Sequence, residues 1–171
     1  GQKGERIDAY MMASMASGGI DKVSVWRKIR VAIITTGEEL MMSGQPLLPG
    51  KIYNSNLAYL TGRLMQLGCD ITEGCFVGDD TEAIVSAVRR SAAQADVILT
   101  TGGVSVGVKD LLPEVIEKLG ADLLFHGIDL KPGMPTMASL YNGKTIISLS
   151  GNPFSASAVF ELLMQPLIRK M

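Results

Sequence analysis

Two hydropathy patterns alternate along most of the chain. Short continuous apolar runs are typical of strands buried on both faces, whereas apolar residues at helical spacing mark helices with one buried face. The runs predict strands over residues 30–35, 70–77, 96–101 and 122–128, and the helical spacing predicts helices around residues 57–67, 84–88, 112–119 and 153–166. Residues 136–140 and 144–149, joined by Asn142-Gly143, predict a hairpin. Alternating strands and helices predict a three-layer α/β fold: a mostly parallel sheet with helices on both faces and a C-terminal hairpin.

The first 29 residues follow a different pattern. Apolar residues at helical spacing over residues 7–15 predict a helix that ends at the glycines of residues 18–19. Alternation over residues 23–25 predicts a short strand. We therefore interpret residues 1–29 as a lead-in from a neighbouring domain, and residues 30–171 as the globular domain.

Composition limits the class of protein. The 171 residues are 47% hydrophobic and 19% charged, with a net charge of −1, which is typical of a globular domain and argues against broad nucleic-acid binding. Cys69 and Cys75 match no zinc-site spacing and are too few for a disulfide framework. No apolar run approaches the ~18 residues of a membrane span. We expect a soluble cytoplasmic protein that binds neither membranes nor nucleic acids.

One short pattern recurs at the ends of three expected strands. Residues 31–37 recur as residues 97–102, with a looser third copy at residues 146–151, so each strand ends in small hydroxyl residues followed by glycine. In open α/β sheets, ligands bind beyond the carboxyl ends of the strands, where glycine lets a ligand approach the backbone. Tight turns explain one such glycine, but three together favour a ligand site. The candidate binding residues are Thr36, Gly37, Gly102, Gly103 and Gly151.

The loop over residues 102–107 is rich in glycine and includes Ser105 and Gly107. Its spacing fits neither a Walker A motif nor a dinucleotide fingerprint, so spacing alone indicates a flexible loop that binds phosphate or a ring. Asp110 follows at the expected start of a helix. A helix N-cap and a metal or ligand contact are equally compatible with Asp110.

A second helix start carries its own signals. Asn152 suits an N-cap and Pro153 the first helical position. A helix N-terminus attracts anions, and the Ser155 hydroxyl could add a donor. A well-capped helix without a ligand is the alternative.

Acidic residues follow the first two strands of the expected domain. Glu38 and Glu39 come after one, and Asp79 and Asp80 after the next. Acids beside a phosphate site commonly hold Mg²⁺. Asp79 with Glu82, however, also fits a helix capping box.

Two further residues carry charge or can acquire it. Lys131 lies in a stiff loop with Pro132 and Pro135, and it could oppose a bound anion. The single histidine, His126, ends an apolar run, and we interpret it as a structural histidine.

Six motifs, in this order, resemble the molybdopterin-binding domain of the molybdopterin molybdenumtransferase family (the MoeA/gephyrin E-domain family). They are Thr36-Gly-Glu-Glu-Leu40, Ile52-Tyr-Asn-Ser-Asn56, Gly78-Asp-Asp80, Thr101-Gly-Gly-Val-Ser-Val-Gly107, Lys131-Pro-Gly-Met-Pro135 and Ser150-Gly-Asn-Pro-Phe-Ser155. The resemblance covers roughly residues 23–170 and implies the MogA-like fold of such domains. Adenylyltransferase and competence-damage-inducible relatives share that fold but lack this form of the glycine loop.

The resemblance implies an activity and roles for the residues in the motifs. Members of the family take adenylylated molybdopterin and molybdate, hydrolyse the AMP link and insert molybdenum into the dithiolene, assisted by Mg²⁺ or a similar ion. Carried over by motif, Glu39, Asp79, Asp80 and Asp110 are the catalytic acids, and Glu39, Asp79 and Asp110 are the metal ligands. The loop over residues 102–107 holds the pterin and phosphate. Lys131 meets an anion, and Asn152 and Pro153 line the molybdate side.

Three positions depart from the family pattern. Met134 stands where a second lysine is frequent, Ser150 where proline is usual, and Val108 where an acid is common. These departures bear on substrate affinity more than on the fold.

The resemblance also implies partners. Family members form homodimers with the active site at a contact between subunits, and a molybdopterin adenylyltransferase-type partner fits the same chemistry. We therefore expect weak activity from this chain alone. A pterin-fold scaffold without catalysis and a competence-damage-type nucleotide hydrolase are the alternatives.

Overall fold

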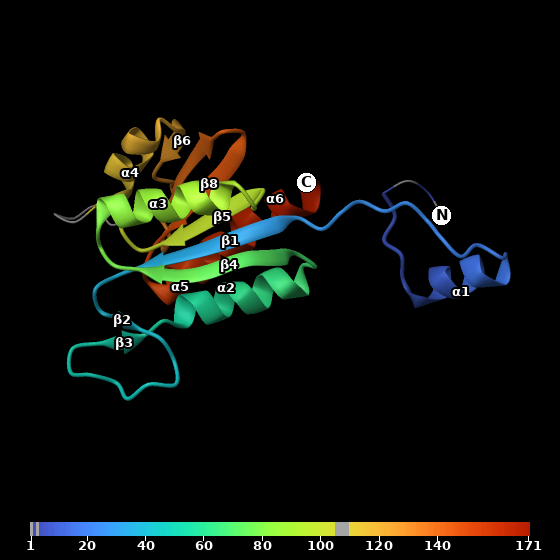
Figure 1. The fold of residues 1–171 in the computed structure, drawn as a ribbon, viewed down its shortest axis with the longest axis horizontal. Coiled ribbons are helices and arrows are strands. Elements are labelled where there is room, and N and C mark those ends of the chain that lie inside the picture. The colour runs from blue at the N-terminus through green and yellow to red at the C-terminus, as the bar shows by residue number, and fades with distance from the viewer. Residues whose placement is uncertain (1, 3, 105–109) are drawn as a thin grey trace.

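A six-stranded sheet forms the centre of the computed structural model, which describes residues 2, 4–104 and 110–171 (Figure 1). Its strands are β1 (Arg30–Thr36), β4 (Asp70–Val77), β5 (Val97–Thr101), β6 (Asp122–His126), β7 (Met137–Tyr141) and β8 (Lys144–Leu149). Across the sheet the order is β4-β1-β5-β8-β7-β6. The first four are parallel, and β7 runs antiparallel to both β8 and β6. This arrangement confirms the predicted α/β class with a mostly parallel sheet and a C-terminal hairpin.

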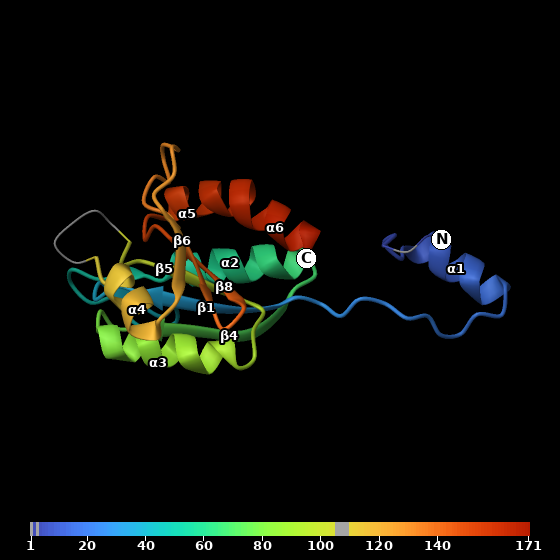
Figure 2. The same cartoon turned by 90° about the horizontal axis from the view of Figure 1, so that it is seen from above.

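Helices cover both faces of the sheet (Figure 2). On one face lie α2 (Ser55–Gln66), α5 (Pro153–Val159), the π-helix η1 (Phe160–Met164) and α6 (Gln165–Lys170), and on the other lie α3 (Thr81–Ala92) and α4 (Leu112–Leu119). Side chains alternate along β1 because successive strand residues point to opposite faces. Val31 and Ile33 join the core beneath α2, while Ala32 and Ile34 join the core beneath α3, and all four are fully buried. The sheet therefore separates two apolar layers, as a continuous apolar strand predicts.

The start of α3 differs from the sequence prediction by one residue. Asp80, not Asp79, is the N-cap, and its side chain accepts a hydrogen bond from Ala83 N at 2.7 Å. The predicted capping box of Asp79 with Glu82 is therefore wrong. Two adjacent aspartates offered two cap positions, and the chain uses the second, which leaves the first for other contacts.

The C-terminal hairpin turns at Asn142 and Gly143, whose φ values are +50° and +71°. Positive φ at both central residues matches the twist of the flanking strands, which explains the Asn-Gly pair. The neighbouring strand β6 ends at His126, two residues earlier than predicted. Gly127 follows with φ +94° and turns the chain away from the sheet.

A small parallel pair, β2 (Leu40–Met41) with β3 (Ile52–Tyr53), projects from the connection between β1 and α2. Each strand has two residues, too few to give an alternating pattern in the sequence. The pair brings the chain back to Asn54, which caps α2 by accepting a hydrogen bond from Leu57 N.

The N-terminal segment stands apart from the sheet, as Figures 1 and 2 show. Helix α1 (Ala9–Ser17) confirms the helix predicted in this segment and has no buried residue. The predicted strand at residues 23–25 is wrong: Val23 and Val25 are exposed and lie in extended chain. Alternation alone does not make a strand where no neighbouring strand is available to pair with it. No helix among the described residues has the length and apolarity needed to cross a membrane.

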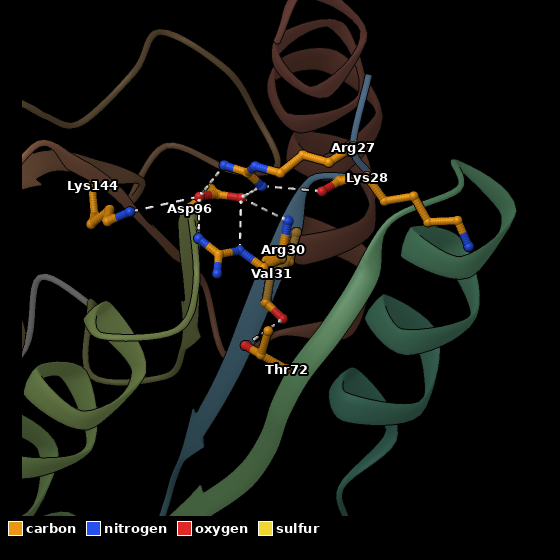
Figure 3. Close-up of polar contacts among 7 residues, drawn as sticks. All are labelled: Arg27, Lys28, Arg30, Val31, Thr72, Asp96 and Lys144. Atoms are coloured by element: carbon orange, nitrogen blue, oxygen red, sulfur yellow. Dashed lines mark hydrogen bonds and ion pairs between the residues drawn. The ribbon is translucent and has the colours of Figure 1, made fainter. Parts of the chain in front are cut away.

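A buried carboxylate ties the lead-in to the amino edge of the sheet (Figure 3). Asp96 precedes β5, and its side chain is 10% exposed. It accepts hydrogen bonds from the guanidinium groups of Arg27 and Arg30, and Lys144 lies 3.6 Å away. Hydrogen bonds from Arg27 are the largest of several influences that hold the pKa of Asp96 well below its usual range. This cluster lies at the opposite edge of the sheet from the candidate site.

Candidate functional site

The carboxyl ends of three adjacent strands meet at one edge of the sheet. β1, β5 and β8 are neighbours, with Thr35 beside Thr101 and Thr101 beside Leu149. Thr36, Gly102 and Ser150 follow directly, with Gly151 after Ser150, so the structure brings the three repeated strand ends together. This confirms the convergence expected from the repeat, at the end of the sheet where α/β proteins bind ligands.

Gly102 allows the closest approach at this edge. Its φ is +91°, and a Cβ there would overlap the carbonyl oxygen of Thr36. Its N–H donates to Leu149 O at 3.2 Å, which joins the end of β5 to the end of β8. A Cβ at Gly151 would contact the Cα of Gly102 at 3.5 Å. The bare backbone at Gly102 is therefore a packing requirement that brings three strand ends into contact.

The two neighbouring candidate glycines are also constrained. At Gly103, φ is +66°, and a Cβ would come within 2.7 Å of the Leu112 side chain. At Gly37, a Cβ would lie 2.8 Å from Oε1 of Glu39. The Glu39 carboxylate therefore folds back over the Gly37 backbone at the end of β1, although the residue as a whole is exposed.

The acids after β4 reach the loop after β1. Asp79 accepts a hydrogen bond through Oδ2 from Glu38 N at 3.2 Å. The structure thus brings Asp79 to the loop that carries Glu39. Asp80, by contrast, is occupied as the cap of α3.

Asp110 lies before α4 but does not cap it. The N-cap of α4 is Leu111, and no side chain provides a capping hydrogen bond. The Asp110 side chain is 16% exposed, and its buried Oδ1 has no hydrogen-bond partner among the described residues. Burial raises the pKa of Asp110, against opposing influences from His126 and the Leu112 backbone. Of the two interpretations left open by the sequence, this geometry favours a ligand contact over a cap.

His126, which the sequence analysis interprets as a structural histidine, lies outside the apolar core. It is exposed at the end of β6, and its Nε2 lies 3.7 Å from Oδ2 of Asp110. The apolar run before it does not indicate burial, because β6 is an edge strand whose Leu123 and Leu124 are themselves more than half exposed.

The loop between β6 and β7 brings Lys131 to the same edge of the sheet. At Gly133, φ is +122°, and a Cβ would come within 2.5 Å of Val159, so the loop packs tightly on α5. Thr136 is buried, and its hydroxyl donates to Gly133 O at 2.7 Å. Lys131 itself is exposed and has no hydrogen-bond or ion-pair partner among the described residues. Its charge is therefore free to meet an anion.

The start of α5 follows the sequence prediction. Asn152 is the N-cap and accepts hydrogen bonds from the backbone N–H groups of Phe154 and Ser155, with Pro153 in the first turn. The side-chain oxygen of Asn152 is thus used in capping, and the N–H groups of Phe154 and Ser155 are both occupied by it. The capped-helix interpretation accounts for these contacts.

The expected metal ligands lie on loops at one edge but form no compact cluster. Within residues 2, 4–104 and 110–171, no group of three His, Cys, Asp or Glu residues is arranged to hold a metal ion. Mg²⁺ commonly takes only one or two carboxylates, with phosphate oxygens and water completing its shell. The predicted loop residues Ser105 and Gly107, and the departure at Val108, lie outside the described residues.

The family described as "Probable molybdopterin binding domain" matches residues 32–170. The chain belongs to this molybdopterin-binding domain family. The resemblance inferred from the six motifs is thereby confirmed.

Relatives and solved structures extend the match beyond the domain core. A molybdopterin molybdenumtransferase of Bacillus subtilis (strain 168) is 38% identical over 167 residues, which cover 98% of this chain and 39% of the relative. One of Staphylococcus epidermidis is 37% identical over 169 residues, which cover 99% of this chain and 40% of the relative. The crystal structure of a molybdopterin biosynthesis MoeA protein from Pyrococcus horikosii has a TM-score of 0.89 at 35% identity. The match covers 99% of this chain and 42% of that protein's chain. The chain therefore spans about 40% of the length of these relatives.

More distant structures share only the fold. They include a tungsten cofactor synthesizing protein MoaB from Pyrococcus furiosus, at 17% identity and a TM-score of 0.66. A CinA protein from Thermoplasma acidophilum has 21% identity and a TM-score of 0.65. Both confirm the fold class expected from the resemblance.

Sequence reasoning missed one residue at the strand ends of this molybdopterin-binding domain. Asn56 is 6% exposed, and its Nδ2 donates to Gly151 O at 2.9 Å, tying α2 to the third strand end. Its Oδ1 is buried without a hydrogen-bond partner among the described residues. The motif over residues 52–56 contains this asparagine, but its partner lies 95 residues away along the chain. No local pattern in the sequence could therefore predict the contact.

Proposed function

We propose that the carboxyl edge of the sheet binds adenylylated molybdopterin, and that the longer protein uses this site for molybdate insertion with release of AMP. The observation that carries the proposal is the meeting of three glycine-bearing strand ends at an edge that also holds acids and Lys131. The carboxyl ends of such sheets bind phosphorylated ligands, because backbone without side chains admits close approach and a cation opposes the anionic charge. The names of relatives at 37–38% identity support the choice of ligand.

Each group at the edge has a proposed task. The exposed backbone at Gly151 gives the ligand access to the strand ends, which the buried Gly102 allows to meet. Lys131 offsets the negative charge of a phosphate or of molybdate. Glu39 and Asp110 are the two candidate bases, one of which accepts the single proton that water loses as it attacks phosphorus and the bond to the leaving phosphate oxygen breaks.

Mg²⁺ fits the donor chemistry of this edge, because carboxylate oxygens are its preferred protein ligands. Asp110 offers an oxygen that is buried and otherwise unsatisfied, and Glu39 offers an exposed carboxylate. Asp79 is the third proposed ligand, through the oxygen not bonded to Glu38. A bound Mg²⁺ would supply neutralising charge to the phosphates, and the protein's own residues would orient the ligand.

The domain boundaries and partners belong to the same proposal. We propose residues 1–29 as a lead-in from a neighbouring domain and residues 30–171 as the binding domain, supported by the lack of buried residues in α1. The longer protein is proposed to be cytoplasmic and homodimeric, and to receive its substrate from a molybdopterin adenylyltransferase-type partner. This chain alone is expected to bind its ligand weakly and to turn over poorly.

Calorimetry under anaerobic conditions tests the proposal. Adenylylated molybdopterin is titrated into the wild type with Mg²⁺, and into Lys131→Met and Asp110→Asn. Each variant is expected to bind about ten- to a hundredfold more weakly, the usual loss for a charged hydrogen-bond partner. Lys170→Met and Asp122→Asn, which change exposed charges away from this edge, are the matched controls and should bind as the wild type does.

The alternatives give different results in the same measurement. A scaffold that retains only the fold would give no heat with the wild type. A competence-damage-type hydrolase would cleave dinucleotide substrates, and its binding would not depend on Lys131. Unchanged affinity in both Lys131→Met and Asp110→Asn would contradict the site assignment.

A further inference from the structure

Asp110 reaches the proposed site with a carboxylate that is mostly buried. Its Oδ1 is buried without a hydrogen-bond partner among the described residues, and its side chain is 16% exposed. A buried carboxylate oxygen without a hydrogen-bond partner costs folding free energy, so its presence calls for an explanation such as a bound ligand. The Nε2 atom of His126 lies 3.7 Å from the other carboxylate oxygen, Oδ2.

The backbone of His126 is firmly held. It is the last residue of β6 and pairs with Met137 of β7. Directly after it, Gly127 N donates to Thr136 O at 2.8 Å, which closes the loop that carries Lys131. The imidazole therefore projects from a fixed strand end, and one third of its surface is exposed.

Neither residue of this pair serves the fold in an obvious way. Asp110 is not a helix cap, and His126 donates no hydrogen bond within the described part of the chain. The 3.7 Å separation is too long for a hydrogen bond but within the range of an ion pair. Contacts of this length in ligand-free sites commonly shorten when the substrate binds.

We propose that His126 is a positioning residue that holds the Asp110 carboxylate for the bound pterin nucleotide by donating from Nε2 to Oδ2. The inference rests on the proposed function, because it assigns a role within that same site. His126 does not touch the substrate in this account and acts only through Asp110. The free Oδ1 of Asp110 is then the oxygen that faces the ligand or its Mg²⁺.

Three substitutions separate a positioning role from a structural one. His126→Gln keeps an N–H donor at the position of Nε2, His126→Asn offers one at the shorter reach of Nδ1, and His126→Leu removes the donor. By anaerobic calorimetry with adenylylated molybdopterin and Mg²⁺, the Asn and Leu variants should bind roughly three- to tenfold more weakly. The Gln variant should bind within about twofold of the wild type, because it restores the donor. In an Asp110→Asn background, His126→Leu should cause no further loss.

A second measurement needs no ligand. The chain has one histidine, so its imidazole ¹⁵N resonances are unambiguous. At one fixed pH, Asp110→Asn should shift these resonances, whereas Asp122→Asn, at the far end of β6, should leave them in place. Equal thermal midpoints across the His126 variants are expected as well, because His126 is exposed.

The outcomes are distinguishable. If the wild type binds adenylylated molybdopterin and His126→Leu binds it with the same affinity, the positioning role is overturned and the proposed function stands. The same holds if His126→Gln binds as weakly as His126→Leu, or if His126→Leu weakens binding further in the Asp110→Asn background. It also holds if Asp110→Asn does not shift the imidazole ¹⁵N resonances. Failure of the wild type to bind overturns the proposed function, and the positioning role with it.

Discussion

Replacing Gly102 with alanine tests the close meeting of strand ends on which the candidate site depends. Two costs follow from the structure. At φ +91°, a side chain strains the backbone by about 1–3 kcal/mol. The new Cβ would also overlap the Thr36 carbonyl oxygen, and relieving such overpacking in a buried site costs about another 1–3 kcal/mol. The expected loss in the free energy of unfolding is therefore about 2–6 kcal/mol.

The matched control is Gly68→Ala. Gly68 has a similar φ of +81°, but a Cβ there would meet no atom within 4 Å, so only the backbone cost applies. Urea unfolding followed by far-ultraviolet circular dichroism gives both free energies, and Gly102→Ala should lose about 1–3 kcal/mol more than Gly68→Ala. For a chain of this size, that difference lowers the thermal midpoint by roughly 2–12 °C. Equal losses in the two variants would show that the ends of β1 and β5 do not approach as described, and would refute the reasoning.

Three further substitutions test the contacts around the sheet. Asp96→Asn should cost about 2–3 kcal/mol in urea unfolding at pH 7, because it leaves Arg30 and Lys144 beside an uncharged buried amide. The folded-state pKa of Asp96 is depressed, so its stabilisation is present above the unfolded pKa of about 3.9 and is lost as the pH falls below that value. The difference in the free energy of unfolding between wild type and variant should therefore disappear in acid. A difference that stays constant with pH would contradict this. Asn152→Ala should cost about 1 kcal/mol through loss of the α5 cap, and Asn152→Ser should restore most of it. Glu161→Gln should cost under about 1 kcal/mol although Glu161 bonds both Arg63 and Tyr59, because Arg63 and Glu161 are 28% and 38% exposed and solvent screens the pair; a loss above about 2 kcal/mol would show that exposure does not weaken this network.

Much of the fold followed from local patterns in the sequence. Continuous apolar runs identified β1 and β5 because both faces of these central strands are buried, and the Asn142-Gly143 pair identified the hairpin through its turn chemistry. The repeated strand ends predicted that β1, β5 and β8 end next to one another, because parallel neighbours place equivalent residues side by side. These features depend on near neighbours in sequence or on general rules of sheet topology.

The errors and omissions depended on tertiary contacts. The strand predicted at residues 23–25 had no partner strand, and the cap assigned to Asp79 belongs to Asp80. The contact of Asp110 with His126 and that of Asn56 with Gly151 join distant segments, so no local pattern could show them. The cluster around Asp96 likewise assembles only when three strands start at the same edge.

Chemical-shift mapping tests the central claim most directly. Adenylylated molybdopterin is titrated anaerobically, with Mg²⁺, into ¹⁵N-labelled protein, and the amide shifts are assigned along the chain. The account predicts that the largest shifts cluster at the carboxyl edge, around Gly37, Gly102, Asp110, Lys131 and Gly151. Shifts confined to the amino edge around Asp96, or none at all at saturating ligand, would contradict it.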